Sequence, residues 1–170
     1  MNEENRFYET SVAEAKNKCI DKLIERCEKA KISKPIREFE IYNLDDLNHL
    51  KIIKKSSYIY IFEEIDGDFE KTFANFSEYK QNTERACPAL NSPSQVLYVG
   101  SSRTGIVNRL MQHKGNGTSK TYALQLDHWF MGQYKITIKE YEEASEVQII
   151  EDALSDILKP AFGKKGGNNK

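Results

Sequence analysis

The chain has 170 residues, which is enough for one domain with a substantial hydrophobic core and too few for two domains of ordinary size. Hydrophobic residues make up 39% and charged residues 30% of the sequence, a globular composition that excludes a largely disordered chain. Its 25 basic and 26 acidic residues leave a net charge of -1, so bulk charge favours no class of partner.

Residues 11–31 are predicted to form an amphipathic helix. Ser11 and Glu14 have the S-x-x-E spacing of a capping box, and apolar residues recur at helical spacing: Val12, Ala15, Cys19, Leu23, Cys27 and Ala30. The cysteines lack a C-x-x-C spacing, and we expect Cys19 and Cys27 to be reduced thiols in the core. This use of cysteine, without a membrane-spanning apolar run or a signal-peptide pattern, indicates a cytoplasmic protein with no membrane partner.

The middle and end of the chain contain the strand patterns. Residues 36–42 alternate like a short strand, and residues 44–50 are expected to form a helical turn. Ser57–Phe62 is rich in aromatic and β-branched residues and is predicted to be a buried strand, as is Gln95–Gly100. Met131–Tyr141 alternates and is predicted to be a further strand.

Residues 63–94 are too many for a hairpin loop between two paired strands, so we interpret them as an insertion. The insertion contains a turn at Asp66-Gly67, a predicted helix near Phe69–Arg85 and a loop from Pro88 to Pro93. Later helices are predicted at Thr104–His113, Thr121–Trp129 and Ser145–Leu158, with a flexible loop at 114–119. Thr104 and Ser145 are the expected N-terminal caps.

Charge is distributed unevenly along the chain. No Asp or Glu occurs from Arg85 to Leu126, and this window contains five basic residues: Arg85, Arg103, Arg109, Lys114 and Lys120. Such a window favours the approach of a phosphate backbone, because a carboxylate there would repel the phosphates. A mildly basic, solvated surface is the alternative interpretation.

Glu151 is the residue for which a purely structural role is hardest to find. It lies on or beside the apolar stripe of its predicted helix, which is formed by Val147, Ile150, Leu154 and Ile157. A carboxylate buried there requires a cation, because an unpaired buried charge is strongly unfavourable. Arg109 or a divalent metal such as Mg²⁺, which prefers oxygen ligands, would serve. The alternative is a carboxylate solvated at the edge of the stripe.

Arg109 and His113 are four residues apart on one predicted helix and so project side by side. A guanidinium fits a phosphoryl group through paired hydrogen bonds, and an imidazole titrates near neutral pH. A surface ion pair for Arg109 and a helix-terminal cation for His113 are the structural alternatives. Tyr60 and Tyr98 come close together only if their strands pair, and tyrosine in a strand is more often packing than chemistry.

The order of these motifs resembles that of the GIY-YIG nuclease superfamily. The motifs are, in chain order, Tyr58-Ile59-Tyr60, Tyr98-Val99-Gly100, Arg109 with His113 on a helix, and Glu151 on a later helix followed by Lys159-Pro160. The resemblance implies an α/β (α+β) domain with a small central three-stranded antiparallel sheet flanked by helices. Residues 57–170 would form this nuclease domain, with the insertion 63–94, and residues 1–56 an N-terminal helical extension.

The resemblance also implies the function, which is hydrolysis of DNA phosphodiesters with one Mg²⁺ or Mn²⁺ ion. Tyr60 would orient or deprotonate the attacking water, and Tyr98 would form a hydrogen bond near the scissile phosphate. Arg109 would stabilise charge on the phosphoryl oxygens, His113 would assist proton transfer or phosphate binding, and Glu151 would hold the metal. Residues expected to contact DNA are Ser101, Ser102, Arg103, Lys114, Lys120 and Asn168.

The sequence departs from the family pattern at three points. Tyr58 stands where the first motif has glycine, Tyr60 and Tyr98 are 38 positions apart, and Gly163 stands where a late asparagine is expected, with Asn168 and Asn169 further on. A non-catalytic nucleic-acid-binding module that retains the nuclease fold is therefore the second hypothesis. A protein–protein interaction domain that docks through helix 11–31 is the third.

Overall fold

The computed structural model describes residues 11–21, 24, 33–44, 47, 56–103 and 105–163, and the chain divides into two compact units, before and after the junction of Ile32 and Ser33. In the first unit, residues 11–21 are helical, as predicted, and most of residues 22–31 lie outside the described part. Cys19 is exposed, so the prediction of a core thiol there is wrong; the described residues of this unit form one helix that leaves all of them exposed. Cys27 lies outside the described residues.

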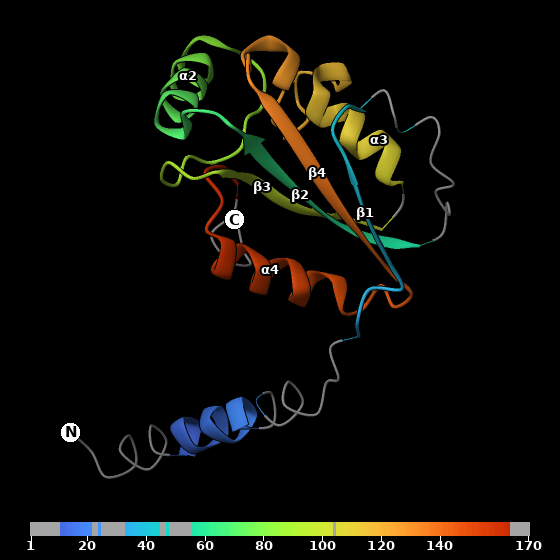
Figure 1. Ribbon diagram of the computed structural model, residues 1–170. Coiled ribbons are helices and arrows are strands. Elements are labelled where there is room, and N and C mark those ends of the chain that lie inside the picture. Colours follow the sequence, from blue (N-terminus) through green and yellow to red (C-terminus); the bar gives the residue numbers. More distant parts are fainter. Residues whose placement is uncertain are drawn as a thin grey trace, which may run out of the picture. The chain divides into compact units, whose positions relative to one another are not determined.

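A four-stranded antiparallel sheet forms the centre of the second unit, in the order β1-β4-β2-β3 (Figure 1). The strands are β1 (Arg37–Ile41), β2 (Ser57–Ile65), β3 (Val96–Ser102) and β4 (Gln133–Tyr141). The mixed helix-and-sheet class and the predicted strand segments are confirmed. The sheet has four strands instead of the expected three because β1 pairs along β4, from Arg37 opposite Glu140 to Ile41 opposite Ile136.

β2 is the central strand, and its first six residues are buried. Tyr58, Tyr60 and Phe62 belong to the core on one face of the sheet, whereas Ile59 and Ile61 belong to a second cluster on the other. Burial on both faces explains why the sequence of β2 is apolar without alternation. Each tyrosine of the first motif therefore faces the same side of the sheet.

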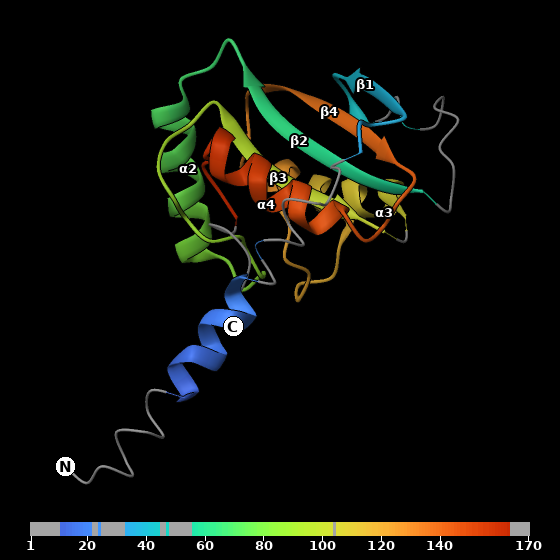
Figure 2. The same cartoon turned by 90° about the horizontal axis from the view of Figure 1, so that it is seen from below.

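The helices of this unit cover both faces of the sheet. They are α2 (Phe69–Asn82), α3 (Ile106–Met111) and α4 (Val147–Leu158). Phe76 of α2 and Leu110 of α3 join the core on the Tyr60 face, whereas Val147 and Ile150 of α4 pack on the Ile59 face. Figure 2 shows α4 lying along the sheet. No helix in the described part of the chain has the length and apolar character needed to cross a bilayer.

The helix ends differ from the sequence predictions. α4 begins after Glu146 without a side-chain cap, so the cap predicted at Ser145 is wrong. α3 likewise follows Gly105 without a side-chain cap, and Thr104 lies outside the described residues. The helix predicted at 121–129 is reduced to a short 3₁₀ helix at Leu126–His128, because Gln125 has a left-handed φ of 60°.

Beyond Met111, the chain of α3 continues into a π-helical turn, Gln112–Asn116, where a flexible loop was expected from residue 114 onward. Gly115, with a φ of 143°, lies inside this turn and interrupts its helical geometry. The turn carries His113 into the core, where it is fully buried. The buried position of His113 determines its role in the candidate site.

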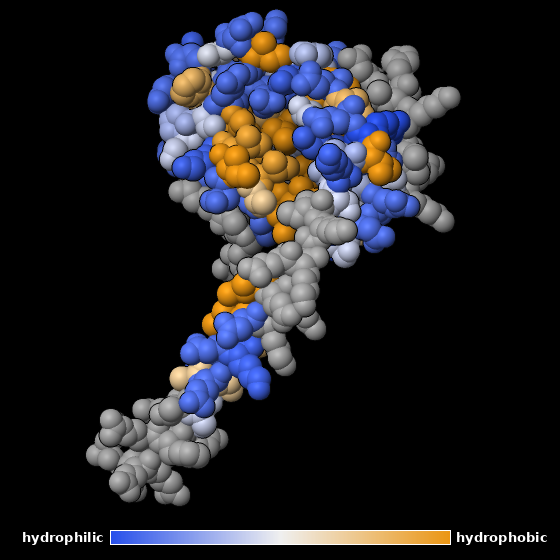
Figure 3. Space-filling view, turned by 60° about the horizontal axis from the view of Figure 1, so that its bottom comes forward, coloured by the Kyte–Doolittle hydropathy of each residue, from blue (hydrophilic) through white to orange (hydrophobic). Residues whose placement is uncertain are grey.

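The outer face of α4 is less covered than its sequence predicts. Val147 and Ile150 of the predicted stripe are buried, but Ile157 is 73% exposed and Ile149 is 51% exposed. Figure 3 shows an apolar area over this helix. The prediction that Ile157 packs in the core is therefore wrong; in the second half of α4, Leu154 and Leu158 pack against the cluster of Ile59 and Ile61 instead.

A buried carboxylate ties β1 to the centre of the sheet. Glu140 on β4 is 1% exposed and accepts hydrogen bonds from Arg37 Nε at 2.8 Å and from the hydroxyl of Tyr58 at 3.1 Å. Tyr58 stands where the GIY-YIG pattern has glycine. Its phenol has a structural partner here, the carboxylate of Glu140 on β4.

We expect Tyr58→Phe to lower the free energy of unfolding by about 1.5–3 kcal/mol, because it removes a buried hydrogen bond to a charged group. Tyr42→Phe is the matched control, since the exposed Tyr42 hydroxyl also donates to a carboxylate, that of Glu40 at 3.1 Å. It should change stability by no more than about 0.5 kcal/mol. Urea denaturation measures both; equal effects would contradict a structural role for the Tyr58–Glu140 bond.

Candidate active site

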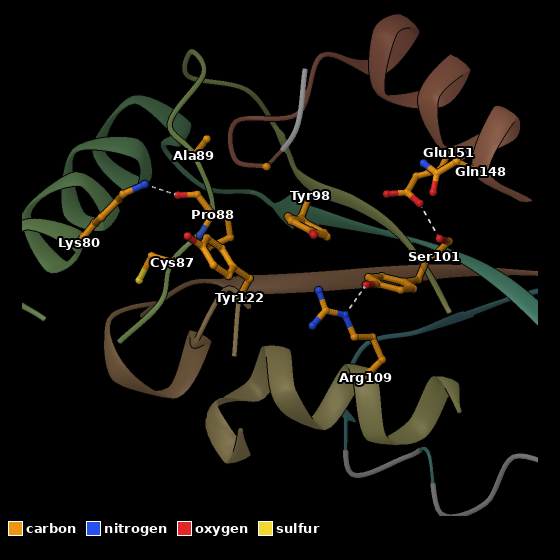
Figure 4. Close-up of a pocket in the computed structure, with 12 residues that line it drawn as sticks. Lys80, Cys87, Pro88, Ala89, Tyr98, Ser101, Arg109, Tyr122, Gln148 and Glu151 are labelled. Atoms are coloured by element: carbon orange, nitrogen blue, oxygen red, sulfur yellow. Dashed lines mark hydrogen bonds between the residues drawn. The ribbon is translucent and has the colours of Figure 1, made fainter. Parts of the chain in front are cut away.

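A cleft of about 720 Å³ lies beside the edge strand β3, between α3 and α4 (Figure 4). Its walls include Tyr60, Tyr98, Arg109 and Glu151, which come from β2, β3, α3 and α4. Four of the five side chains that the sequence predicted as catalytic therefore share one cleft. The fifth, His113, is not one of the described residues that line the cleft.

Gly100 allows this convergence. It pairs with Tyr60 across the β2–β3 ladder, and a Cβ atom at Gly100 would lie 2.5 Å from the Tyr60 hydroxyl oxygen and 2.7 Å from Cε1 of Tyr98. Both distances are too short for any side chain at position 100. The tyrosine of the central strand thus reaches the cleft over an edge strand that carries no side chain at this point.

The Tyr60 hydroxyl is the centre of a buried hydrogen-bond network. Arg109 Nε donates to it at 3.0 Å, and Nε2 of His113 lies 3.1 Å from it. The backbone N–H of Leu124 donates to Nδ1 of His113 at 3.2 Å, so the neutral imidazole carries its proton on Nε2 and donates to Tyr60. The Tyr60 oxygen therefore accepts two hydrogen bonds, and its own proton remains available to a ligand in the cleft.

The pKa directions agree with this assignment. Burial raises the pKa of Tyr60 far above its usual value, so the phenol stays protonated. Burial, followed by the charge of Arg109, holds the pKa of His113 well below 6.5, so the imidazole stays neutral. Burial alone would lower the pKa of Arg109, but the phenols of Tyr60 and Tyr98 raise it, and the guanidinium stays charged.

His113 is placed differently from the sequence prediction. Its ring lies behind Tyr60 and Tyr98, with centroid distances of 5.4 and 4.7 Å. Since it does not line the cleft, it cannot bind the phosphate of a ligand there directly. We interpret it as a residue that positions the Tyr60 hydroxyl. His113 lies in the π-helical turn that follows α3, and it is fully buried there.

Glu151 lies on the opposite side of the cleft from Arg109 in Figure 4. Its Oε2 accepts a hydrogen bond from the hydroxyl of Ser101 at 2.5 Å, and Gln148 lines the cleft one turn earlier on α4. This wall offers carboxylate, hydroxyl and amide oxygens, the donors that Mg²⁺ and Mn²⁺ prefer. No cluster of three or more His, Cys, Asp or Glu suited to a metal occurs among the described residues.

A single carboxylate still fits Mg²⁺, because this ion keeps most of its water and is often held by one or two carboxylates together with substrate phosphates. Zn²⁺ fits poorly, since structural and catalytic zinc sites use three or four nitrogen, sulfur or carboxylate ligands. Glu151 would therefore be the protein ligand of a weakly held, substrate-dependent ion, with Ser101 fixing the orientation of its carboxylate.

The residues expected to contact nucleic acid lie at several places. Arg103 is exposed beside the cleft, in a depression of about 350 Å³ that it shares with Ser101, Ser102 and Arg109. Ser102 Oγ accepts from the N–H of Gly105 at 3.3 Å, and Ser101 is engaged by Glu151. Lys120 is exposed and Lys114 is half-buried, whereas Asn168 lies outside the described residues.

Arg85, the first cation of the acid-free window, has a structural role. Its Nη2 donates to the carbonyl oxygens of Gly115 and Gly117 at 3.2 and 2.6 Å, and its Nε donates to Gln125 Oε1 at 3.0 Å. These bonds hold the loop after α3 against the end of the insertion. The window is therefore only partly a ligand-facing surface.

The sequence analysis missed the residues that form the other end of the cleft. They are Lys80, the segment 87–89 and Tyr122. The position of Lys80 and residues 87–89 inside an apparent insertion gave no signal of a site. Tyr122 lay inside the acid-free window, and an exposed aromatic residue there was the one available clue.

No protein-family model, curated protein or solved structure matches the chain. The chemistry of the cleft therefore has to be inferred from its own residues.

At Gly163, where the GIY-YIG pattern has asparagine, a Cβ atom would lie 3.0 Å from the Tyr98 ring. Asn91, from the insertion, donates to the carbonyl oxygen of Pro160 at 2.9 Å and holds this turn in place.

We expect Gly100→Ala to lower the free energy of unfolding by about 1–3 kcal/mol, because the new methyl group would displace Tyr60 and Tyr98. Gly105→Ala is the control, since the nearest atom beyond its chain neighbours, Nδ2 of Asn108, would lie 3.9 Å from its Cβ. It should change stability by no more than about 0.5 kcal/mol. Urea denaturation distinguishes the two, and an equal response would show that the site tolerates a side chain at position 100.

The buried neutral His113 should make stability depend on pH. The unfolded chain binds a proton at His113 near pH 6.5 that the folded protein does not bind, so folding stability is retained above that pH and lost as pH falls below it. The slope should approach about 1.4 kcal/mol per pH unit. His113→Gln should flatten this part of the profile. Parallel profiles for wild type and His113→Gln would refute the assignment.

Proposed function

We propose that this chain is a metal-dependent DNA endonuclease of the GIY-YIG type. The observation that carries the proposal is the convergence of Tyr60, Arg109 and Glu151 on one cleft from β2, α3 and α4. These side chains are far apart in the sequence, and together they provide a hydrogen-bond donor, a cation and a carboxylate. That set suits a phosphodiester, which carries a charge and gains more charge during cleavage.

One wall of the cleft would bind the phosphate. The guanidinium of Arg109 is half-buried and stays charged, so it can form strong hydrogen bonds with phosphoryl oxygens. Tyr60, whose hydroxyl keeps its own proton, lines the same cleft. Because both acceptor positions of the Tyr60 oxygen are used by Arg109 and His113, Tyr60 acts as a donor to a phosphoryl oxygen and does not take a proton from water.

The other wall would hold the metal. Among the described residues that line the cleft, the one with a carboxylate is Glu151, which accepts a hydrogen bond from Ser101. When bound, Mg²⁺ or Mn²⁺ would polarise the phosphate and stabilise the leaving oxygen. A phosphate held by Arg109 would then face the Glu151 wall of the cleft, and the protein would fix the positions of both side chains in advance.

A non-catalytic nucleic-acid-binding module is the second candidate. The observation that favours it is the position of His113, since a neutral imidazole shielded by Tyr60 cannot exchange protons with a bound substrate. Such a module would bind DNA in a salt-dependent way and leave it intact. Cleavage assays therefore separate the two candidates.

In Mg²⁺ or Mn²⁺, we expect the purified protein to nick plasmid DNA or cut oligonucleotides, in duplex or single-stranded form. Glu151→Gln should abolish cleavage, and Arg109→Lys should lower its rate by about 100-fold, because a bidentate donor is lost. Asp156→Asn is the control, since Asp156 is an exposed carboxylate on the same helix. Its activity should equal that of the wild type.

Folding of each variant is checked by circular dichroism and thermal unfolding. Cleavage that persists in Glu151→Gln would contradict the assignment of Glu151 as the metal ligand. If the wild type binds DNA in a salt-sensitive way but forms no cleavage product with Mg²⁺ or Mn²⁺, the protein is the non-catalytic binding module and not a nuclease.

A further inference from the structure

The cleft is much larger than a phosphate group requires. Its volume of about 720 Å³ lies in the range of pockets that enclose whole small-molecule ligands. In Figure 4 the charged and hydroxylic groups, Glu151 and Ser101, gather toward one end, and Arg109 lies near the middle. Space therefore remains at the other end for a second part of the ligand.

That other end is mainly apolar. Its walls are Cys87, Pro88, Ala89 and Tyr122, with Lys80 behind them (Figure 4). Lys80 Nζ donates to the carbonyl oxygen of Pro88 at 2.5 Å, so its charge is directed at the backbone of the wall. The described lining of this end contains no carboxylate. A flat, uncharged group next to a phosphate would fit these surroundings.

At this end of the cleft, Tyr122 has a solvent-exposed aromatic ring. It is 67% exposed, whereas Tyr60 is fully buried. The ring of Tyr98 is half-buried, lies nearly parallel to that of Tyr60 with an interplanar angle of 13°, and packs against His113. An exposed tyrosine at the mouth of a cleft is a surface on which a nucleic acid base can stack.

The loop that carries Tyr122 is held in place. Arg85 binds the carbonyl oxygens of Gly115 and Gly117, and the N–H of Ala86 donates to the carbonyl oxygen of Ser119 at 2.7 Å. Residues 87–89, the facing wall, follow Ala86 directly. The two walls are thereby fixed to each other before any ligand arrives, which lowers the entropic cost of binding.

We infer that the apolar end of the cleft receives an unpaired base, stacked on Tyr122, whose adjoining phosphate lies at Arg109. The substrate is then a single strand, or a strand locally unpaired, because a base in a regular duplex is stacked between its neighbours and its ring faces cannot also stack on Tyr122. This inference rests on the proposed function in one respect, namely that the cleft binds a phosphodiester.

The test measures binding of fluorescent probes by anisotropy in EDTA, where metal-dependent cleavage does not occur. The probes are a short oligothymidylate, a chain of abasic deoxyribose phosphates of equal length and charge, and the duplex form of the oligothymidylate. The wild type should bind oligothymidylate about 5- to 100-fold more tightly than the abasic chain, which reflects stacking of one base. It should bind the duplex more weakly than the single strand.

Tyr122→Ala should remove the preference for bases and leave affinity for the abasic chain within about twofold, since no phosphate contact is lost. Tyr122→Phe keeps the ring and should keep the preference. Equal responses of the two variants, no preference in the wild type, or duplex bound as tightly as single strand would each overturn the inference. In those cases an intact affinity for the phosphate chain leaves the proposed function standing. Failure of every probe to bind would overturn both.

Discussion

At Gly100 the edge strand β3 carries no side chain, and the hydroxyl of Tyr60 occupies the space that a methyl group would need. This close approach determines the rest of the site. It lets a residue of the central strand reach a cleft at the edge of the sheet, where Arg109 and His113 can meet its oxygen. It also explains why the glycine of the second motif matters more here than the glycine missing from the first.

The network around Tyr60 assigns different tasks to residues that the sequence grouped together. His113 is held neutral by burial and fixes the phenol, while Arg109 is the charged group that faces the cleft. Glu151, on the far wall, is oriented by Ser101. The cleft thus has a cationic donor wall and an oxygen-rich wall, with a ligand-sized space between them and an aromatic surface at one end.

Much of the fold was predictable because its elements have strong local signals. The β-branched and aromatic runs gave β2, β3 and β4, and the alternation at 36–42 gave β1, although the resemblance to a three-stranded family left β1 out of the sheet. The helix caps were less predictable. Ser145 had the right spacing, but cap geometry depends on how the chain enters the helix, which residue spacing does not encode.

The candidate site was predictable where residues have few structural uses. Glu151 on an apolar stripe required a partner, and Arg109 occurred in a window without acids. Helical spacing correctly put His113 beside Arg109, since both contact the Tyr60 hydroxyl, but spacing did not show that His113 would be fully buried behind the tyrosines. Tyr122 was missed because its position depends on a loop that Arg85 and Ala86 hold through backbone carbonyl oxygens, and Lys80 was missed because it lies in the apparent insertion.

The central claim is that a phosphate binds between Arg109 and a metal on Glu151. Crystals grown with Mn²⁺ and a phosphorothioate oligonucleotide that resists cleavage test it directly, since the anomalous signal of manganese locates the ion. The account predicts manganese on the carboxylate of Glu151, shared with a phosphate oxygen, and the same phosphate within hydrogen-bond reach of Arg109 and Tyr60. Manganese bound elsewhere, or an oligonucleotide that leaves the cleft empty, would contradict it.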